Sequence, residues 1–116
     1  MASSAVSLTR ENGRVVCEHL LVAARPFRRM RGLLGRAELP SDEGILLRPA
    51  GSVHTFFMRF PIDVVFLDRE EVVVGIEPSL APWRTAGRRG AKAVVELAAG
   101  ECERRGVQVG DRLVAA

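Results

Sequence analysis

Three side chains capable of acid–base or ionic chemistry lie within one apolar, β-prone stretch of the sequence. The stretch is SVHTFFMRFPIDVVFLD, residues 52–68, and it contains His54, Arg59 and Asp63. Charged groups are costly to bury unless they are paired and hydrogen-bonded. Pro61 cannot donate a ladder hydrogen bond, so it should break the strand. We therefore predict a bend that brings Arg59 and Asp63 together as a charge-assisted pair.

A further carboxylate, Glu96, interrupts the apolar run AVVELAA. In the structural interpretation, Arg59 pairs with Asp63 or Glu96, and the network fixes the register of the strands around the bend. His54 then hydrogen-bonds to the backbone. This interpretation predicts that Arg59, Asp63 and Glu96 are mutually close and largely buried.

The functional interpretation is a ligand pocket beside the same polar groups. Aromatic rings would supply apolar contact, and Arg59 would hold an anionic or hydroxylated ligand. The candidate ligand-binding residues are His54, Met58, Arg59, Asp63, Trp83, Glu96 and Arg31.

Catalysis is the alternative use of this stretch. His54 and Asp63 could form the acid–base pair of a hydrolase-like enzyme, with Ser52 or Thr55 as nucleophile, but the chain has no G-x-S-x-G elbow. Metal binding by His54, Asp63 and Glu96 lacks tight ligand spacing, and P-loop and Rossmann patterns are absent. We therefore predict a non-catalytic ligand-binding or accessory domain without metal or cofactor, whose partner is a small molecule or a protein.

The composition is that of one globular domain. The chain has 116 residues, 47% hydrophobic and 27% charged, and no apolar run reaches the ~20 residues of a membrane span. Residues 1–13 show no secretory pattern, so the expected location is the cytoplasm. Cys17 and Cys102 lie in no C-x-x-C motif. Buried reduced thiols are expected, although spacing alone leaves a disulfide open.

Arginine clusters give the chain a net charge of +3 and a pI near 9.6. They occupy residues 24–36 and 83–92, and such clusters can bind phosphates. Only 5% of the residues are aromatic, however, and none alternates with the arginines as a stacking platform would require. A solvated surface is the favoured interpretation, and weak nucleic-acid binding is the alternative, through Arg28, Arg29, Arg31, Arg84, Arg88 and Arg89.

Strands dominate the predicted elements. Asn12-Gly13 suits a type I′ turn in an N-terminal hairpin whose second strand runs from Arg14 to about Ala23. Pro26 to Leu34 has the spacing of a short helix. Strands are predicted within residues 44–49, 52–59, 62–68, 71–77 and 92–97 and at the C-terminal end, with a loop at 78–91 and a helical turn near 98–106. This content predicts a mainly β domain, a sandwich or partly closed barrel with one or two short helices.

Three segments resemble, in order, the pattern of the domain of unknown function 192 family: RGLLGR, SVHTFFMRFPIDVVFLD and VVELAAGECERRGVQVGDRL. The resemblance spans roughly Arg25 to Leu113, within a single domain of residues 1–116 that begins with the hairpin. It implies a compact, jelly-roll-like β fold and no established activity. The matching family positions are Arg31, Gly32, Leu33, Met58, Arg59, Asp63, Glu96, Gly100, Gly110 and Asp111, and Phe57 stands where many members carry Trp.

Overall fold

Strands make up most of the computed structural model, which describes residues 6–23 and 37–116. The single helix of this part is α2, Glu101–Arg104. The strands are β1 Leu8–Arg10, β2 Val15–Cys17, β3 His19–Ala23, β4 Glu43–Leu47, β5 Ser52–His54, β6 Ile62–Leu67, β7 Val73–Leu80, β8 Thr85–Gly87, β9 Ala93–Ala98 and β10 Leu113–Ala115. The mainly β prediction is confirmed, and the described strands do not close into a barrel. No helix of this part is long and apolar enough to cross a membrane.

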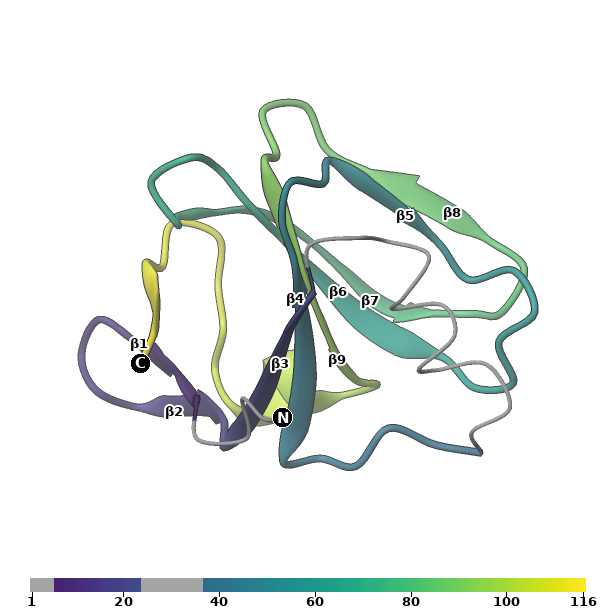
Figure 1. Ribbon diagram of the computed structural model, residues 1–116, viewed down its shortest axis with the longest axis horizontal. Coiled ribbons are helices and arrows are strands. Elements are labelled where there is room, and N and C mark those ends of the chain that lie inside the picture. The colour runs from purple at the N-terminus through teal and green to yellow at the C-terminus, as the bar shows by residue number, and fades with distance from the viewer. Residues whose placement is uncertain (1–5, 24–36) are drawn as a thin grey trace.

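A five-stranded sheet in the order β3-β4-β9-β6-β7 forms the centre of the molecule. Its strand pairs are antiparallel except β3 and β4, which run parallel. Two small sheets, β10-β1-β2 and β5-β8, lie on either side of it (Figure 1). The central sheet is therefore covered on both faces.

Coverage on both faces explains why β6 and β9 are continuous apolar runs rather than alternating ones. Successive side chains of a strand point to opposite faces, so Val65 and Val95 enter one core while Val64 and Val94 enter the other. The first core packs the central sheet against β1, β2, β10 and α2. The second packs it against β5 and β8, with Met58, Phe60 and Leu80 filling the space between.

The N-terminal hairpin is confirmed, but its turn type differs from the prediction. Gly13 has φ 90°, whereas Asn12 keeps a negative φ. The Gly13 N–H donates to the Arg10 carbonyl at 2.8 Å, and the Arg10 N–H donates to the Arg14 carbonyl at 2.8 Å. This is a three-residue loop ending in a left-handed glycine, in which Asn12 Oδ1 accepts the Arg14 N–H.

Three predicted boundaries are corrected by the structure. The strand expected from Arg14 to Ala23 divides at Glu18, because β2 and β3 belong to different sheets. The strand expected over residues 52–59 ends at His54. The segment expected to be a loop, 78–91, holds the end of β7 and all of β8. The helix predicted at 26–34 lies outside the described residues, and the predicted helical turn is α2.

Both cysteines are free and buried in the first core. Burial raises the pKa of the Cys17 thiol to about 11, against a smaller opposing effect of Arg105. Burial also raises the pKa of Cys102, and the nearby Asp63 carboxylate raises it further. The thiols are therefore protonated packing groups at neutral pH.

Candidate functional site

Aromatic side chains gather on the surface at the β5–β8 end of the molecule. The Phe57 and Trp83 ring centroids are 4.6 Å apart, and those of Phe56 and Trp83 are 5.9 Å apart. The His54 ring stacks on Phe56 at 4.8 Å. We call Phe56, Phe57 and Trp83, with His54 at the edge, the aromatic platform. The exposed fractions of Phe56, Phe57 and Trp83 are 38%, 62% and 54%, so all three rings face solvent.

Thr55 holds the two loops of the platform together. Its buried hydroxyl donates to the Ala81 carbonyl at 2.6 Å and accepts the Arg84 N–H at 2.9 Å. Its backbone N–H donates to the Arg84 carbonyl at 2.8 Å, and its carbonyl accepts the Trp83 N–H at 2.9 Å. Hydrogen bonds buried in this way are costly to break, so the loop carrying Phe56 and the loop carrying Trp83 form one unit.

Two residues of the platform have left-handed backbone conformations. Phe57 has φ 69° and Trp83 has φ 66°. Bulky residues rarely adopt positive φ, because the Cβ atom then crowds the backbone, at a cost of about 1–2 kcal/mol per residue. Strained residues of this kind concentrate at ligand sites, where the surrounding structure enforces them. Both are also solvent-exposed, so burial does not offset the strain.

A groove of about 590 Å³ adjoins the platform and runs over the outer face of the β5–β8 sheet. Cross-strand pairs place Ser52 opposite Gly87 and His54 opposite Thr85, while Val53 points into the second core. The floor of the groove therefore carries two hydroxyl groups, an imidazole and one position without a side chain. Phe56 and His54 line both the groove and the platform.

Charge is segregated around this site. Residues 48–62 and 78–92, which we call the basic lobe, contain no Asp or Glu, although the chain has 14. The basic lobe carries six cationic side chains, Arg48, Arg59, Arg84, Arg88, Arg89 and Lys92. Two of the six form ion pairs with carboxylates outside the lobe, Arg48 with Glu71 and Arg88 with Glu77. Arg59, Arg84, Arg89 and Lys92 have no ion pair with a described residue, so they supply the positive charge that an approaching ligand would meet.

Arg88 belongs to the predicted basic cluster but is held within the protein. Its guanidinium lies 5.1 Å from the centroid of the Phe66 ring and donates to the Ile76 carbonyl at 3.1 Å. Gly75 lies opposite Phe66 and makes this possible, because a Cβ at Gly75 would stand 2.7 Å from Arg88 Cδ. Arg88 therefore braces β7 and is not available to a ligand.

Asp63, a predicted site residue, is 1% exposed and points away from the platform. Its Oδ1 accepts the Ser79 N–H at 2.8 Å, and its Oδ2 accepts the Cys102 N–H at 2.9 Å. Cys102 belongs to α2 and the first core, so the carboxylate caps the helix from a neighbouring strand. Through these two hydrogen bonds, Asp63 holds α2 and the end of β7 against β6, at the point where the β6–β7 register shifts.

The predicted triad of Arg59, Asp63 and Glu96 is wrong. Arg59 is exposed, and no ion pair joins it to a described residue. Glu96 is 0% exposed, but it lies opposite Val64 on β9 and faces the second core, whereas Asp63 faces the first. Pro61 does not break the expected strand, because β5 already ends at His54 and Pro61 directly precedes β6. The bend instead turns Arg59 outward, because Met58 and Phe60 take the inward positions.

The remaining predicted residues divide between platform and core. Trp83 and His54 are brought together through Phe56, whereas Met58 is buried in the second core. His54 cannot form the proposed pair with Asp63, because the five-stranded sheet separates the two side chains. Arg31 lies outside the described residues. In the described part of the chain, no cluster of three His, Cys, Asp or Glu side chains could hold a metal ion.

Sequence reasoning missed Phe56, Phe57 and the Thr55 clamp. A signal was present, because Phe56-Phe57 is a pair of adjacent large rings in a strand-like segment. Adjacent strand residues point to opposite faces, so two adjacent rings leave the core together only where the strand alternation ends, as it does after His54. Their contact with Trp83 depends on a loop 26 residues further along and could not be derived from spacing.

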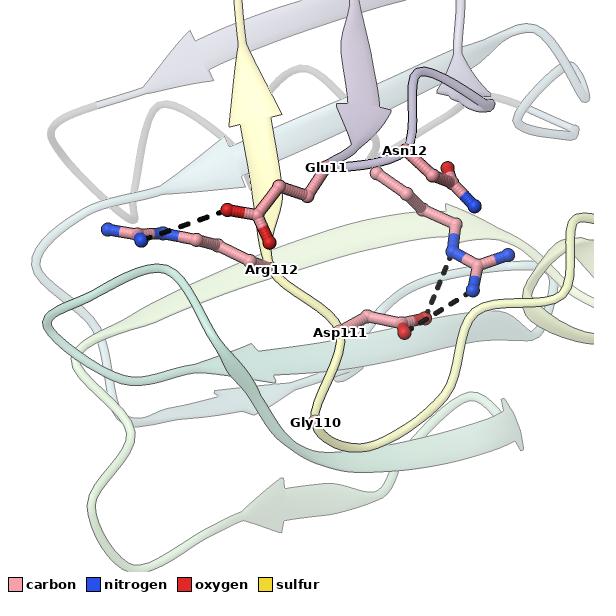
Figure 2. Close-up of a pocket in the computed structure, with 6 residues that line it drawn as sticks. Glu11, Asn12, Gly110, Asp111 and Arg112 are labelled. Atoms are coloured by element: carbon pink, nitrogen blue, oxygen red, sulfur yellow. Dashed lines mark hydrogen bonds and ion pairs between the residues drawn. The ribbon is translucent and has the colours of Figure 1, made fainter.

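A second, polar cavity of about 380 Å³ lies between the β1–β2 turn and the segment before β10 (Figure 2). Arg10 faces Asp111, with Nε–Oδ2 at 3.2 Å, and Arg112 faces Glu11 at 3.9 Å. The Gln108 N–H also donates to Asp111 at 2.8 Å. Two cations and two anions balance here, so the cavity has no net charge to select an ionic ligand, and its contacts tie the hairpin to the C-terminal segment.

Comparison with known families places the chain. The model of the domain of unknown function 192 family, described as "Uncharacterized ACR", matches residues 7–115. The chain belongs to this family. A member named UPF0127 protein from Thermococcus sibiricus is 30% identical over 115 residues, which covers 91% of this chain and 71% of the relative. A UPF0127 protein from Pyrococcus furiosus is 48% identical over 63 residues, 53% of each chain.

Solved structures of similar proteins share this fold. A protein of unknown function from Novosphingobium aromaticivorans superimposes with a TM-score of 0.79 at 25% identity, covering 94% of this chain and 82% of that one. A proposed transcription regulator from Sinorhizobium meliloti superimposes with a TM-score of 0.78 at 26% identity, covering 99% and 97%. The family is of unknown function, and neither comparison shows a catalytic role.

Proposed function

We propose that this domain is a non-catalytic binding module whose recognition surface is the aromatic platform and the adjoining groove. The observation that carries the proposal is the pair Phe57 and Trp83. Both rings are exposed, both backbones are left-handed, and the rings contact each other. The exposure of the rings and the left-handed backbones work against stability, and such departures from local rules are expected at binding sites.

The binding residues proposed are His54, Phe56, Phe57 and Trp83, with Arg59 at the border of the platform. The rings supply flat apolar surface, so the ligand has a planar or apolar face. The hydroxyls of Ser52 and Thr85 and the imidazole of His54 supply polar contacts in the groove. Met58, Asp63 and Glu96 act as supports, since they are buried. The jelly-roll-like arrangement and a cytoplasmic location stay predictions beside this proposal.

Trp83 makes the proposal directly testable, because it is the only tryptophan in the chain. The experiment titrates sugars, nucleosides, nucleotides and aromatic acids while recording tryptophan emission and the melting temperature. A ligand at the platform changes the emission and raises the melting temperature. A ligand that raises the melting temperature with unchanged Trp83 emission would place binding elsewhere and contradict the proposal, as would a complete absence of response.

A further inference from the structure

Four exposed cations of the basic lobe form no ion pair within the part of the chain that the structure describes. Arg59, Arg84, Arg89 and Lys92 are exposed, and no ion pair joins them to any described residue. By contrast, Arg48 pairs with Glu71 at 2.6 Å outside the lobe. Exposed cations without carboxylate partners are the electrostatic feature that attracts a polyanion.

Cations and stacking rings occur side by side in the chain. Arg84 directly follows Trp83, and its guanidinium donates to the Trp83 carbonyl at 3.2 Å. Arg59 follows Phe57 by two residues. A ligand stacked on the platform would therefore have positive charge within reach on both loops. This juxtaposition supplies the stacking platform that the sequence pattern alone does not reveal.

Single-stranded nucleic acid has the chemistry that matches both features. Its bases expose flat faces that stack on aromatic side chains, and its phosphates are attracted by Arg and Lys. Bases in a duplex are already stacked on one another, so they cannot use exposed rings in this way. The groove floor, with the hydroxyls of Ser52 and Thr85 and the imidazole of His54, offers polar contacts to a sugar or a base edge.

Resting on the function proposed above, we propose that the ligand of the aromatic platform is single-stranded nucleic acid. Bases stack on Phe56, Phe57 and Trp83, while Arg59, Arg84, Arg89 and Lys92 contact phosphates. The binding tolerates different sequences, because every base has a stacking face.

The experiment measures binding of fluorescein-labelled oligo-dT and oligo-U by anisotropy, with Trp83 emission recorded in parallel on unlabelled strands. Contacts with three or four phosphates should weaken binding roughly 20- to 50-fold between about 50 and about 200 mM salt. Strand binding should quench Trp83. An abasic strand of equal length and a blunt duplex should bind more weakly than oligo-dT.

Variants separate the roles of rings and charges. Phe57→Gly removes a ring at a backbone position that suits glycine, and it should raise the Kd by at least about 5-fold. Arg84→Gln should reduce the slope of log affinity against log salt by about 0.7. Arg14→Gln is the matched control, because Arg14 is exposed on the hairpin, away from the basic lobe, and it should leave the Kd and the slope unchanged.

The outcomes distinguish the two proposals. If the abasic strand, heparin or the duplex binds as tightly as oligo-dT, the rings are not reading bases and the nucleic-acid proposal is overturned. If a nucleoside or sugar changes Trp83 emission while an oligonucleotide gains no affinity over it, the binding module stands and single-stranded nucleic acid is rejected. If no probe changes Trp83 emission, both proposals fail.

Discussion

Charged side chains around α2 form ion pairs with one another, whereas four exposed cations of the basic lobe do not pair with described carboxylates. Glu101 accepts hydrogen bonds from Arg104 at 2.7 Å and from Arg105 at 3.1 Å. Arg105 also donates to Glu18 at 2.9 Å and to the Ser41 carbonyl at 2.9 Å. In the basic lobe, four exposed cations have no carboxylate partner among the described residues.

The hydrophobic side chains show the same contrast. Around α2 and the first core, Val16, Val95 and Leu97 are fully buried, and backbone groups are capped by Asp63. At the aromatic platform, Phe57 and Trp83 stay exposed with strained backbones. The first region is optimised for stability. The second keeps exposed rings on strained backbones and cations without ion pairs to described residues, which is why we propose recognition there.

The largest expected effect in this comparison is at Asp63. Asp63→Ala leaves two buried N–H groups, of Ser79 and Cys102, without an acceptor, so we expect a loss of about 3 kcal/mol or more in the free energy of unfolding. Urea unfolding at neutral pH measures it. Asp68→Ala is the matched control, because Asp68 also accepts two N–H groups, at 2.8 and 3.0 Å, but at a half-exposed turn. Equal losses for both variants would contradict the scaffold role of Asp63.

The buried thiols predict a loss of stability at alkaline pH. In the unfolded chain a thiol releases its proton above its ordinary pKa near 9, whereas folded Cys17 keeps it until about pH 11. The folded state then holds more protons, so stability is constant below pH 9 and falls as the pH rises towards 11. The pKa of Cys102 is raised as well. The two thiols together should therefore lower the free energy of unfolding by about 2–3 kcal/mol between pH 8 and pH 10.

Denaturant unfolding across this pH range is a clean test, because the chain has no Tyr and one Lys. Cys17→Ala and Cys102→Ala should each flatten the alkaline fall by about half, whatever they do to stability at pH 7. An alkaline fall that persists in full in the double variant would show that other groups cause it.

A smaller effect is expected from Glu101. Hydrogen bonds from Arg104 hold the pKa of Glu101 below its ordinary value, and those from Arg105 add to this. Because the folded pKa is depressed, the stabilisation is present above the ordinary pKa near 4.5 and is lost as the pH falls through the folded value. Glu101→Gln should cost about 1–2 kcal/mol at pH 7 and should flatten the acid limb of stability between about pH 5 and pH 2. An unchanged acid limb would count against the network.

Sequence patterns were sufficient for the strands whose environment is uniform. β6 and β9 were found because their apolar, β-branched runs are typical of strands, and the hairpin followed from Asn12-Gly13. The division at Glu18 was missed, because the change of sheet depends on a parallel pairing with β4 that leaves no local signal. β8 was missed because three residues between prolines and glycines carry too little pattern.

For the candidate site, the sequence predicted the burial of its carboxylates but not which side chains contact one another. Burial of Asp63 and Glu96 followed correctly from their apolar neighbours. The predicted pairing with Arg59 did not, because β5 ends at His54 and strand alternation cannot be carried through the turn that leads to β6. His54 and Trp83 were both named as candidate ligand-binding residues, and in the structure both rings stack on Phe56. Their link through Phe56 is tertiary, and it depends on the Thr55 clamp.

The smallest expected change in stability tests the platform itself. Phe57→Gly removes backbone strain worth about 1–2 kcal/mol, but it loses a ring contact worth about 0.5–1.5 kcal/mol and adds freedom to the unfolded chain. These effects nearly cancel, so the free energy of unfolding should change by less than about 1 kcal/mol. Phe66→Ala, in the second core, should cost about 3–5 kcal/mol instead.

Phe57→Ala separates the effect of backbone strain from the effect of the lost ring, because it removes the same ring and keeps a Cβ on the left-handed backbone. It should therefore be less stable than Phe57→Gly in thermal unfolding. The reverse order would mean that φ 69° stores no strain, and the main reason for placing a binding site at Phe57 would be lost.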